Sequence, residues 1–132
     1  MFHALPGDAI DEITMLLAEK ARGNVPFNAG LRGLRSLGSG VAFDIGCPEL
    51  EKVRGEIASA FDGRLTKQDC QTWRPHITVQ NKASRESAGK LLASLQREFQ
   101  PWPISVEGME LWRYDGGPWE FTAAFRFGMA GD

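Results

Sequence analysis

Three stretches of the chain repeat hydrophobic residues every three or four positions, the spacing of an amphipathic helix. We expect helices over about residues 8–23, 48–62 and 84–99. Asp8 follows a Pro-Gly pair and suits a helix N-cap, and Pro48 suits the first turn of the second helix. Ser84 is expected to cap the third helix, and Pro101 and Pro103 follow its end.

Other stretches alternate hydrophobic and polar residues, which is the period of a strand with one buried face. Strands are expected around 25–31 and 41–45, joined by a Leu-Gly-Ser-Gly hairpin turn at 37–40, then a short strand from His76, and finally about 104–114 and 119–127. In the short strand, His76 and Thr78 share the polar face and Ile77 and Val79 are expected to be buried. The odd-numbered residues from 119 to 127 are expected to face the core.

The order of these elements suggests an internal duplication. A β-α-β-β arrangement fits the first part of the chain and fits again at 75–127. We therefore predict an α+β fold in one 132-residue domain, with lobe one over about 1–46, a linking helix over about 48–62 and lobe two over about 64–127. Each lobe would pack helices on one face of an antiparallel sheet, and the other faces would look onto a central cleft.

The composition of the chain limits the classes of function that it can have. With 42% hydrophobic and 24% charged residues, the chain is typical of a globular domain, and neither a membrane span nor a signal peptide is expected. A net charge of −2 excludes attraction of the whole molecule to nucleic acid or anionic lipid, so any phosphate binding must be local. Two separated cysteines, Cys47 and Cys70, favour a reducing, cytoplasmic setting. With only His3 and His76 besides, they lack metal-ligand spacing, and no metal is expected.

The sharpest chemical candidate is His76 with Thr78. Two positions apart on a strand, their side chains emerge on one face about 6.5–7 Å apart. A histidine can exchange a proton near neutral pH, and a threonine hydroxyl can hold a phosphate oxygen. Pro75 suits a strand start, which leaves Arg74 near the mouth of the predicted cleft. A surface histidine without a chemical role is the common alternative for His76.

The residues around His76 resemble a known motif. Arg-Pro-His-Ile-Thr-Val-Gln-Asn-Lys at 74–82 looks like the second H-x-T signature of the 2H phosphoesterases. Residues 2–7, 65–69 and 111–120 are similar to stretches of bacterial 2′-5′ RNA ligase-like proteins, so the resemblance covers most of the chain. The three-letter motif alone is a weak signal, but with these flanks it is stronger. The histidine-triad nucleotide hydrolases need H-x-H-x-H and are not matched.

The resemblance implies a mechanism. Two histidines from two H-x-T/S motifs would act as general base and general acid on a cyclic phosphate or a 2′-5′ linkage, and the two hydroxyls would hold the phosphate. It implies no metal and no cofactor. The expected partners are RNA ends or cyclic nucleotide phosphates, and the expected activity is that of an RNA 2′,3′-cyclic phosphodiesterase or 2′-5′ RNA ligase-like hydrolase.

The sequence departs from the family pattern in one respect, because it contains a single H-x-T, at 76–78. Aligning the two lobes sets Asn81 against His3, so the partner histidine is expected about three residues before Met1. The chain then begins within its first motif strand, which would make this form weak or inactive. His3 could substitute as a catalytic residue, although a histidine at a strand end or in a loop is the simpler interpretation.

Further substrate-binding candidates are polar or aromatic residues near the motif or in the tail. They are Trp73, Arg74, Gln80, Lys82, Arg113 and Tyr114. Cations in this region could steer a phosphate, and aromatic rings could stack a base, but a solvated loop and core packing are the respective alternatives. Arg32 and Arg35 are expected on the surface, with a phosphate-facing position as the alternative.

Three functions remain open from the sequence. The first is a 2H phosphoesterase, and the second is a non-catalytic module that binds RNA ends or nucleotides. The third is an interaction domain that uses an exposed N-terminal sheet edge, because unpaired strand edges recruit other strands. That edge also predicts a homodimer through the N-terminal lobe. Hydrolysis of a 2′,3′-cyclic phosphate separates the first function from the other two.

Overall fold

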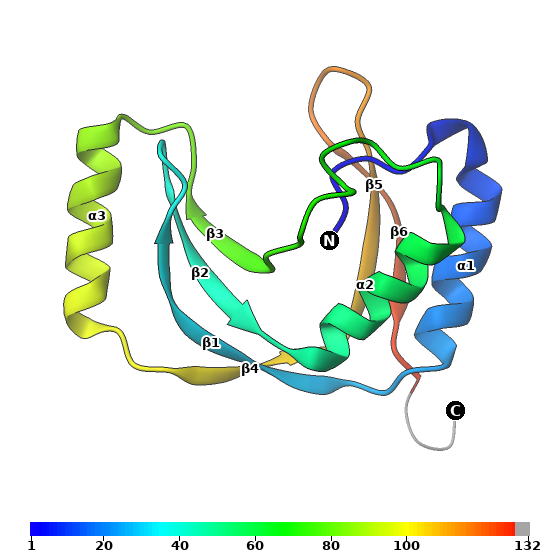
Figure 1. The fold of residues 1–132 in the computed structure, drawn as a ribbon, viewed down its shortest axis with the longest axis horizontal. Coiled ribbons are helices and arrows are strands. Elements are labelled where there is room, and N and C mark those ends of the chain that lie inside the picture. The colour runs from blue at the N-terminus through cyan, green and yellow to red at the C-terminus, as the bar shows by residue number, and fades with distance from the viewer. Residues whose placement is uncertain (129–132) are drawn as a thin grey trace. The chain divides into compact units, whose positions relative to one another are not determined.

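A computed structural model of the chain describes residues 1–128 and has the mixed α and β content expected from the sequence (Figure 1). The elements in chain order are η1 (Gly7–Ala9), α1 (Ile10–Arg22), β1 (Phe27–Ser36), β2 (Val41–Gly46), α2 (Pro48–Ala60), β3 (His76–Gln80), α3 (Arg85–Glu98), β4 (Trp102–Val106), β5 (Gly108–Arg113) and β6 (Glu120–Arg126). None of the helices among residues 1–128 is long and apolar enough to cross a membrane. The chain divides into two compact units, which we call unit one and unit two.

Unit one comprises Met1 and residues 28–50 and 72–104, and its centre is a four-stranded sheet in the order β3-β2-β1-β4. Strand β2 is antiparallel to both β1 and β3. The predicted hairpin turn between β1 and β2 is confirmed, with Gly38 at a φ of 85° that suits glycine. Ser84 caps α3 by accepting a hydrogen bond from the Ser87 backbone N–H, at 3.1 Å.

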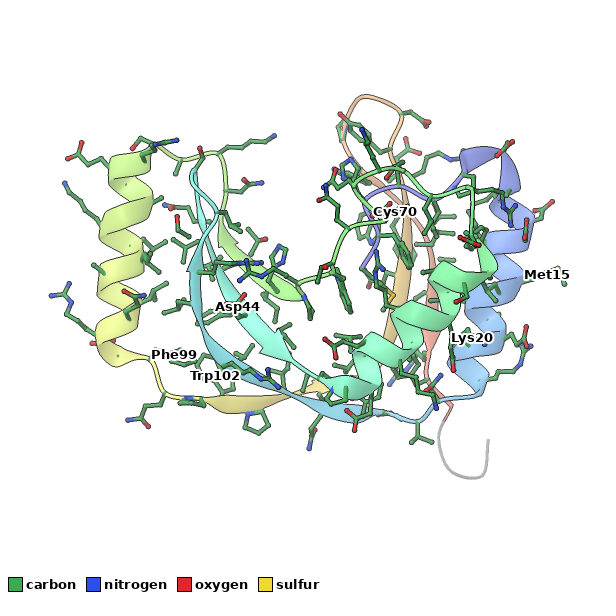
Figure 2. All side chains as sticks on the ribbon, in the orientation of Figure 1. Met15, Lys20, Asp44, Cys70, Phe99 and Trp102 are labelled. Atoms are coloured by element: carbon green, nitrogen blue, oxygen red, sulfur yellow. The ribbon has the colours of Figure 1, made fainter. Side chains whose placement is uncertain are left out.

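One face of this sheet is apolar. Phe43 of β2 lies against Phe99, just after α3, and against Trp102 of β4, with ring centroids 6.0 Å and 5.4 Å apart. Figure 2 shows Phe99 and Trp102 together at the end of α3. Helix α3 lies beside this part of the sheet (Figure 1), and its predicted apolar stripe is half-buried apart from the fully buried Ala88.

Among the described residues, unit two comprises 2–27, 51–71 and 105–128 and contains the main hydrophobic core. Ile13 and Leu17 of α1 pack with Val53 and Ile57 of α2 and with Phe61, all at most 5% exposed. The paired strands β5 and β6 contribute to this core through the partly buried side chains of Met109, Leu111 and Phe125. The predicted apolar stripes of both helices are therefore confirmed.

The two units are interleaved in sequence, which differs from the expected lobes of contiguous residues. The β1–β2 hairpin comes from the first half of the chain but pairs with β3 from the second half. The β5–β6 hairpin comes from the second half but packs against α1 from the first. Each hairpin thus joins elements from the other half, an exchange that element order alone does not reveal.

The single strand expected over 104–114 is wrong, because the chain breaks it at Glu107. Strand β4 joins the sheet of unit one, whereas β5 pairs with β6 in unit two. At the break, the Phe127 N–H donates to the Glu107 carbonyl at 2.9 Å. A Cβ on Gly108 would lie 2.5 Å from the Phe125 carbonyl oxygen, so this approach requires glycine.

The expectation that residues 119, 121, 123, 125 and 127 share a core face is also wrong in part. Phe127 is buried and stacks on Phe27 at 5.4 Å, but Trp119 and Phe121 are each 54% exposed. The register of β5 and β6 shifts by one residue, from Leu111 opposite Ala123 to Trp112 opposite Phe121. One extra residue reverses the alternation beyond it, so Phe121 meets the Trp112 ring at 5.5 Å instead of entering the core.

The N-terminal segment does not form the expected strand, since residues 1–6 have no regular secondary structure. The carboxylate of the buried Asp69 accepts hydrogen bonds from the backbone N–H groups of His3 and Ala4, at 2.7 Å and 2.9 Å. These bonds hold the segment by its main chain. Asp8 is not the N-cap either, because the 3-10 turn η1 precedes α1 and Ala9 occupies that position.

Candidate active-site face of unit one

His76 and Thr78 lie on a polar face of the four-stranded sheet. In the register of β2 and β3, Asp44 is opposite His76 and Ala42 is opposite Thr78. In the register of β1 and β2, Gly33 is opposite Asp44 and Arg35 is opposite Ala42. Directly opposed residues share a face, so small and polar residues surround the motif. We call the residues Gly33, Arg35, Ala42, Asp44, His76 and Thr78 the polar face.

Ile77 and Val79 are not buried beneath the motif as expected. They are 42% and 44% exposed. Strand β3 is at the edge of the sheet, where only β2 flanks it, so its second face has less cover than that of a central strand. The register of β3 also shifts by one residue at Val79, from Thr78 opposite Ala42 to Gln80 opposite Val41.

The His76 ring is held by its own strand. Its Nδ1 lies 2.8 Å from the carbonyl oxygen of Arg74, and His76 is exposed. A carbonyl oxygen can only accept, so Nδ1 carries the hydrogen and Nε2 is the unprotonated nitrogen of the neutral ring. The preceding Pro75 is buried, and its carbonyl accepts the Ile45 N–H at 3.0 Å. His76 therefore presents Nε2 to solvent as a proton acceptor.

An ion pair on the polar face is a feature that the sequence analysis missed. Arg35 Nε lies 3.3 Å from Asp44 Oδ1, and their side chains are 17% and 32% exposed. Figure 2 labels Asp44 on β2, the strand next to the one that carries His76. The sequence signal was present, since residues two apart on each strand share a face, but finding the pair required the register of two strand pairs.

The other candidates from unit one lie around the motif. Arg74 and Lys82 are exposed, and Trp73 is half-buried. Gln80 is opposite Val41, beyond the register shift, and its buried Oε1 has no hydrogen-bond partner among the described residues. The shift takes Gln80 out of the alternation that placed it with Thr78, so the structure gives it no shared face with His76.

Comparison with known proteins shows the family of the chain. A family model described as the 2′-5′ RNA ligase superfamily matches residues 1–118. The chain belongs to this superfamily. The superfamily acts on RNA phosphodiesters, so membership supports a function of the 2H phosphoesterase type.

A solved structure shares the fold of this 2′-5′ RNA ligase superfamily member. The crystal structure of TT0787 from Thermus thermophilus matches with a TM-score of 0.58 and 17% sequence identity, covering 94% of this chain and 73% of that one. At this identity the likeness shows the fold alone. No curated protein matches the chain significantly in sequence.

Three candidates of this superfamily member belong to unit two. His3 is exposed and is fixed through its backbone N–H, and a catalytic role for it stays a prediction. Arg113 and Tyr114 lie at the end of β5, where Tyr114 stacks on Trp119 with centroids 4.6 Å apart. Tyr114 and Trp119 are 57% and 54% exposed, so packing in the core does not account for them.

Within residues 1–128, no three His, Cys, Asp or Glu side chains gather in a way that could hold a metal ion. A shallow groove of about 460 Å³ lies between residues 28–32 and 101–103, and its lining includes neither His76 nor Thr78. The groove therefore shares no residue with the polar face.

Proposed function

We propose that this protein hydrolyses 2′,3′-cyclic phosphates at RNA ends, with His76 as a proton-transfer group and Thr78 as a ligand of the phosphate. The observation that carries the proposal is the exposed His76 ring, whose Nδ1 is held by the Arg74 carbonyl and whose Nε2 is free. Thr78 lies two residues along the same strand, and membership of the 2′-5′ RNA ligase superfamily supplies the substrate class.

The reaction requires two proton transfers. The oxygen of a water molecule bonds to phosphorus, and the bond from phosphorus to one ribose oxygen breaks. Nε2 of neutral His76 accepts the proton from the water, and the released ribose oxygen takes a proton from a second acid or from solvent. Each positioned acid or base contributes roughly 10²- to 10⁴-fold in rate, so a site with one positioned group is expected to be slow.

A second candidate function has a specific observation in its favour. The chain contains one H-x-T motif rather than two. A polar face with one histidine, one threonine and one arginine can bind an RNA phosphate without cleaving it. The alternative is therefore a module that binds RNA ends or nucleotides.

The test uses a short RNA that ends in a 2′,3′-cyclic phosphate, with EDTA present. Mass spectrometry follows the gain of one water, which marks opening of the ring. We expect slow turnover by the wild-type chain and a loss of roughly 10²-fold or more in His76→Ala. Lys90→Ala is the matched control, because Lys90 lies on exposed α3 and pairs only with Glu86 in the described structure.

The outcomes separate the two functions. Turnover that His76→Ala removes and Lys90→Ala retains supports the esterase. Turnover that is equal in wild type and His76→Ala would show that His76 takes no part in the reaction, and the esterase proposal would be withdrawn. Saturable binding of the cyclic RNA without turnover would favour the binding module.

A further inference from the structure

We propose that Arg35 is a phosphate-binding residue of this site and that Asp44 is its positioning residue. This inference rests on the proposed function, because it identifies a third group that would contact the same phosphate as His76 and Thr78. From the sequence, Arg35 is expected on the surface, with a phosphate-facing position as the alternative. The register and the ion pair place it on the polar face, which favours the alternative.

Arg35 lies in line with Thr78 across the sheet. Arg35, Ala42 and Thr78 form one row across β1, β2 and β3. Neighbouring strands lie about 4.8 Å apart, so the extended arginine side chain can span the strand between it and Thr78. The middle residue of the row is Ala42, which is fully buried and whose methyl group is small enough for an arginine side chain to pass over it. The guanidinium lies over β2, because its Nε contacts Asp44 Oδ1 at 3.3 Å.

The Arg35 guanidinium has hydrogen-bond donors that the protein does not use. A guanidinium carries five N–H donors. Asp44 is the one polar partner of the Arg35 side chain within residues 1–128, and Arg35 Nε is buried without a well-aligned hydrogen bond. A phosphate has several acceptor oxygens and matches the fork of an arginine. It would satisfy donors that the protein itself leaves unpaired.

The carboxylate of Asp44 is paired with Arg35 although Asp44 is opposite His76. Asp44 is opposite His76, yet its carboxylate contacts Arg35 and not the imidazole, which bonds instead to the Arg74 carbonyl. The ion pair neutralises a carboxylate that would otherwise repel an anion beside His76. It also fixes Arg35 at Nε, which leaves the two terminal nitrogens for a ligand. Asp44 therefore acts through Arg35.

The test combines binding and turnover. Calorimetry measures the Kd of adenosine 2′-monophosphate, a product-like probe, and the cyclic-phosphate RNA reports kcat/KM. In Arg35→Gln we expect Kd to rise about 10- to 100-fold, the range for a charge-assisted hydrogen bond to phosphate, with a similar fall in kcat/KM. Arg35→Lys keeps the charge but not the fork, so it should recover part of the loss. Arg97→Gln removes an exposed arginine from α3 and serves as the control.

Asp44→Asn distinguishes positioning from simple repulsion. If Asp44 positions Arg35, the variant binds the probe more weakly, and the effects of Asp44→Asn and Arg35→Gln are not additive in the double variant. Tighter binding by Asp44→Asn would overturn the positioning role. Circular dichroism and thermal unfolding check that each variant is folded, and Arg35→Lys replaces Arg35→Gln as the decisive variant if the latter unfolds.

The role of Arg35 and the esterase activity can be disproved separately. If wild type turns over the RNA and His76→Ala abolishes turnover, the proposed function stands. Unchanged Kd and kcat/KM in folded Arg35→Gln would then overturn the role of Arg35 alone. If wild type neither binds the probe nor cleaves the RNA, both proposals fail.

Discussion

The imidazole of His76 is oriented by a backbone carbonyl and not by a charged side chain. Because the Arg74 carbonyl is two residues away on the same chain, the tautomer is set locally and does not depend on distant packing. The hydroxyl of Thr78 is likewise placed by the alternation of one strand. This local origin explains why the pair could be predicted from the sequence, whereas the Arg35–Asp44 pair required knowledge of strand register.

Thr78 gives a prediction at this scale. Thr78→Ala removes the hydroxyl that would hold a phosphate oxygen, whereas Thr78→Ser retains it and alters only the β-branched methyl. We expect Thr78→Ala to lower kcat/KM on the cyclic-phosphate RNA by roughly 10-fold, the effect of losing a hydrogen bond to a charged group, and Thr78→Ser to stay close to wild type. If the two variants are equally impaired, the loss comes from strand packing and the hydroxyl has no role.

The two cysteines provide a second prediction. Burial raises the pKa of the Cys47 thiol, and its Sγ lies 3.3 Å from Glu49 Oε2, whereas Cys70 is exposed. Thiolate is the reactive form, so iodoacetamide near pH 8 should label Cys70 well before Cys47 in the native protein. Peptide mass spectrometry over time measures the two rates. Equal rates in folded protein, compared with a urea-unfolded control, would contradict the burial of Cys47.

A few backbone features determine where the strands of this fold lie, and the hydrophobic periodicity of the sequence does not reveal them. The bulge in β6 sends Phe121 to the face of Trp112, and the break before Gly108 assigns β4 and β5 to different sheets. Periodicity located the helices and the β1–β2 hairpin because their stripes are long and their turn is short. It missed the break and the bulge because a single inserted residue leaves the hydrophobic pattern almost unchanged.

Gly108 tests this account of the strand break. Gly108→Ala would set a Cβ 2.5 Å from the Phe125 carbonyl oxygen, and we expect it to lower the free energy of unfolding by about 1–3 kcal/mol. Gly55→Ala is the matched control, because Gly55 is exposed on α2 with no heavy atom near its added Cβ, and alanine there should stabilise the helix by about 0.5–1 kcal/mol. Urea unfolding measures both. A neutral Gly108→Ala would show that the β5–β6 approach is looser than described.

At the scale of the whole molecule, the sequence predicted the fold class, whereas the exchange of hairpins between the two halves depends on long-range pairing. The family match and the shared fold with TT0787 support the fold class independently. The family could be recognised from the stretch at 74–82 and its similar flanks because these residues are local in sequence. The sequence did not reveal which helices and strands belong to each unit, because β2 and its partner β3 are separated by a helix and a loop.

The homodimer expected through the N-terminal lobe remains a prediction, and unpaired strand edges in unit two are a further place where the chain could associate. Strands β5 and β6 pair only with each other among the described residues, so the two-stranded sheet has unpaired edges that can recruit another chain. Trp112 and Phe121 on this hairpin are 45% and 54% exposed. We expect light scattering to show dimers that increase with concentration. A monomer at every concentration would contradict the prediction.

We propose above that the polar face of unit one binds the phosphate. The most direct measurement is a titration of ¹⁵N-labelled protein with adenosine 2′-monophosphate, followed through backbone amide shifts in two-dimensional NMR. We predict saturable shifts concentrated at residues 33–35, 42–44 and 74–78, which require about 10- to 100-fold more ligand in Arg35→Gln and are unchanged in Arg97→Gln. Shifts confined to the β5–β6 hairpin, or no saturable shifts at all, would contradict the claim.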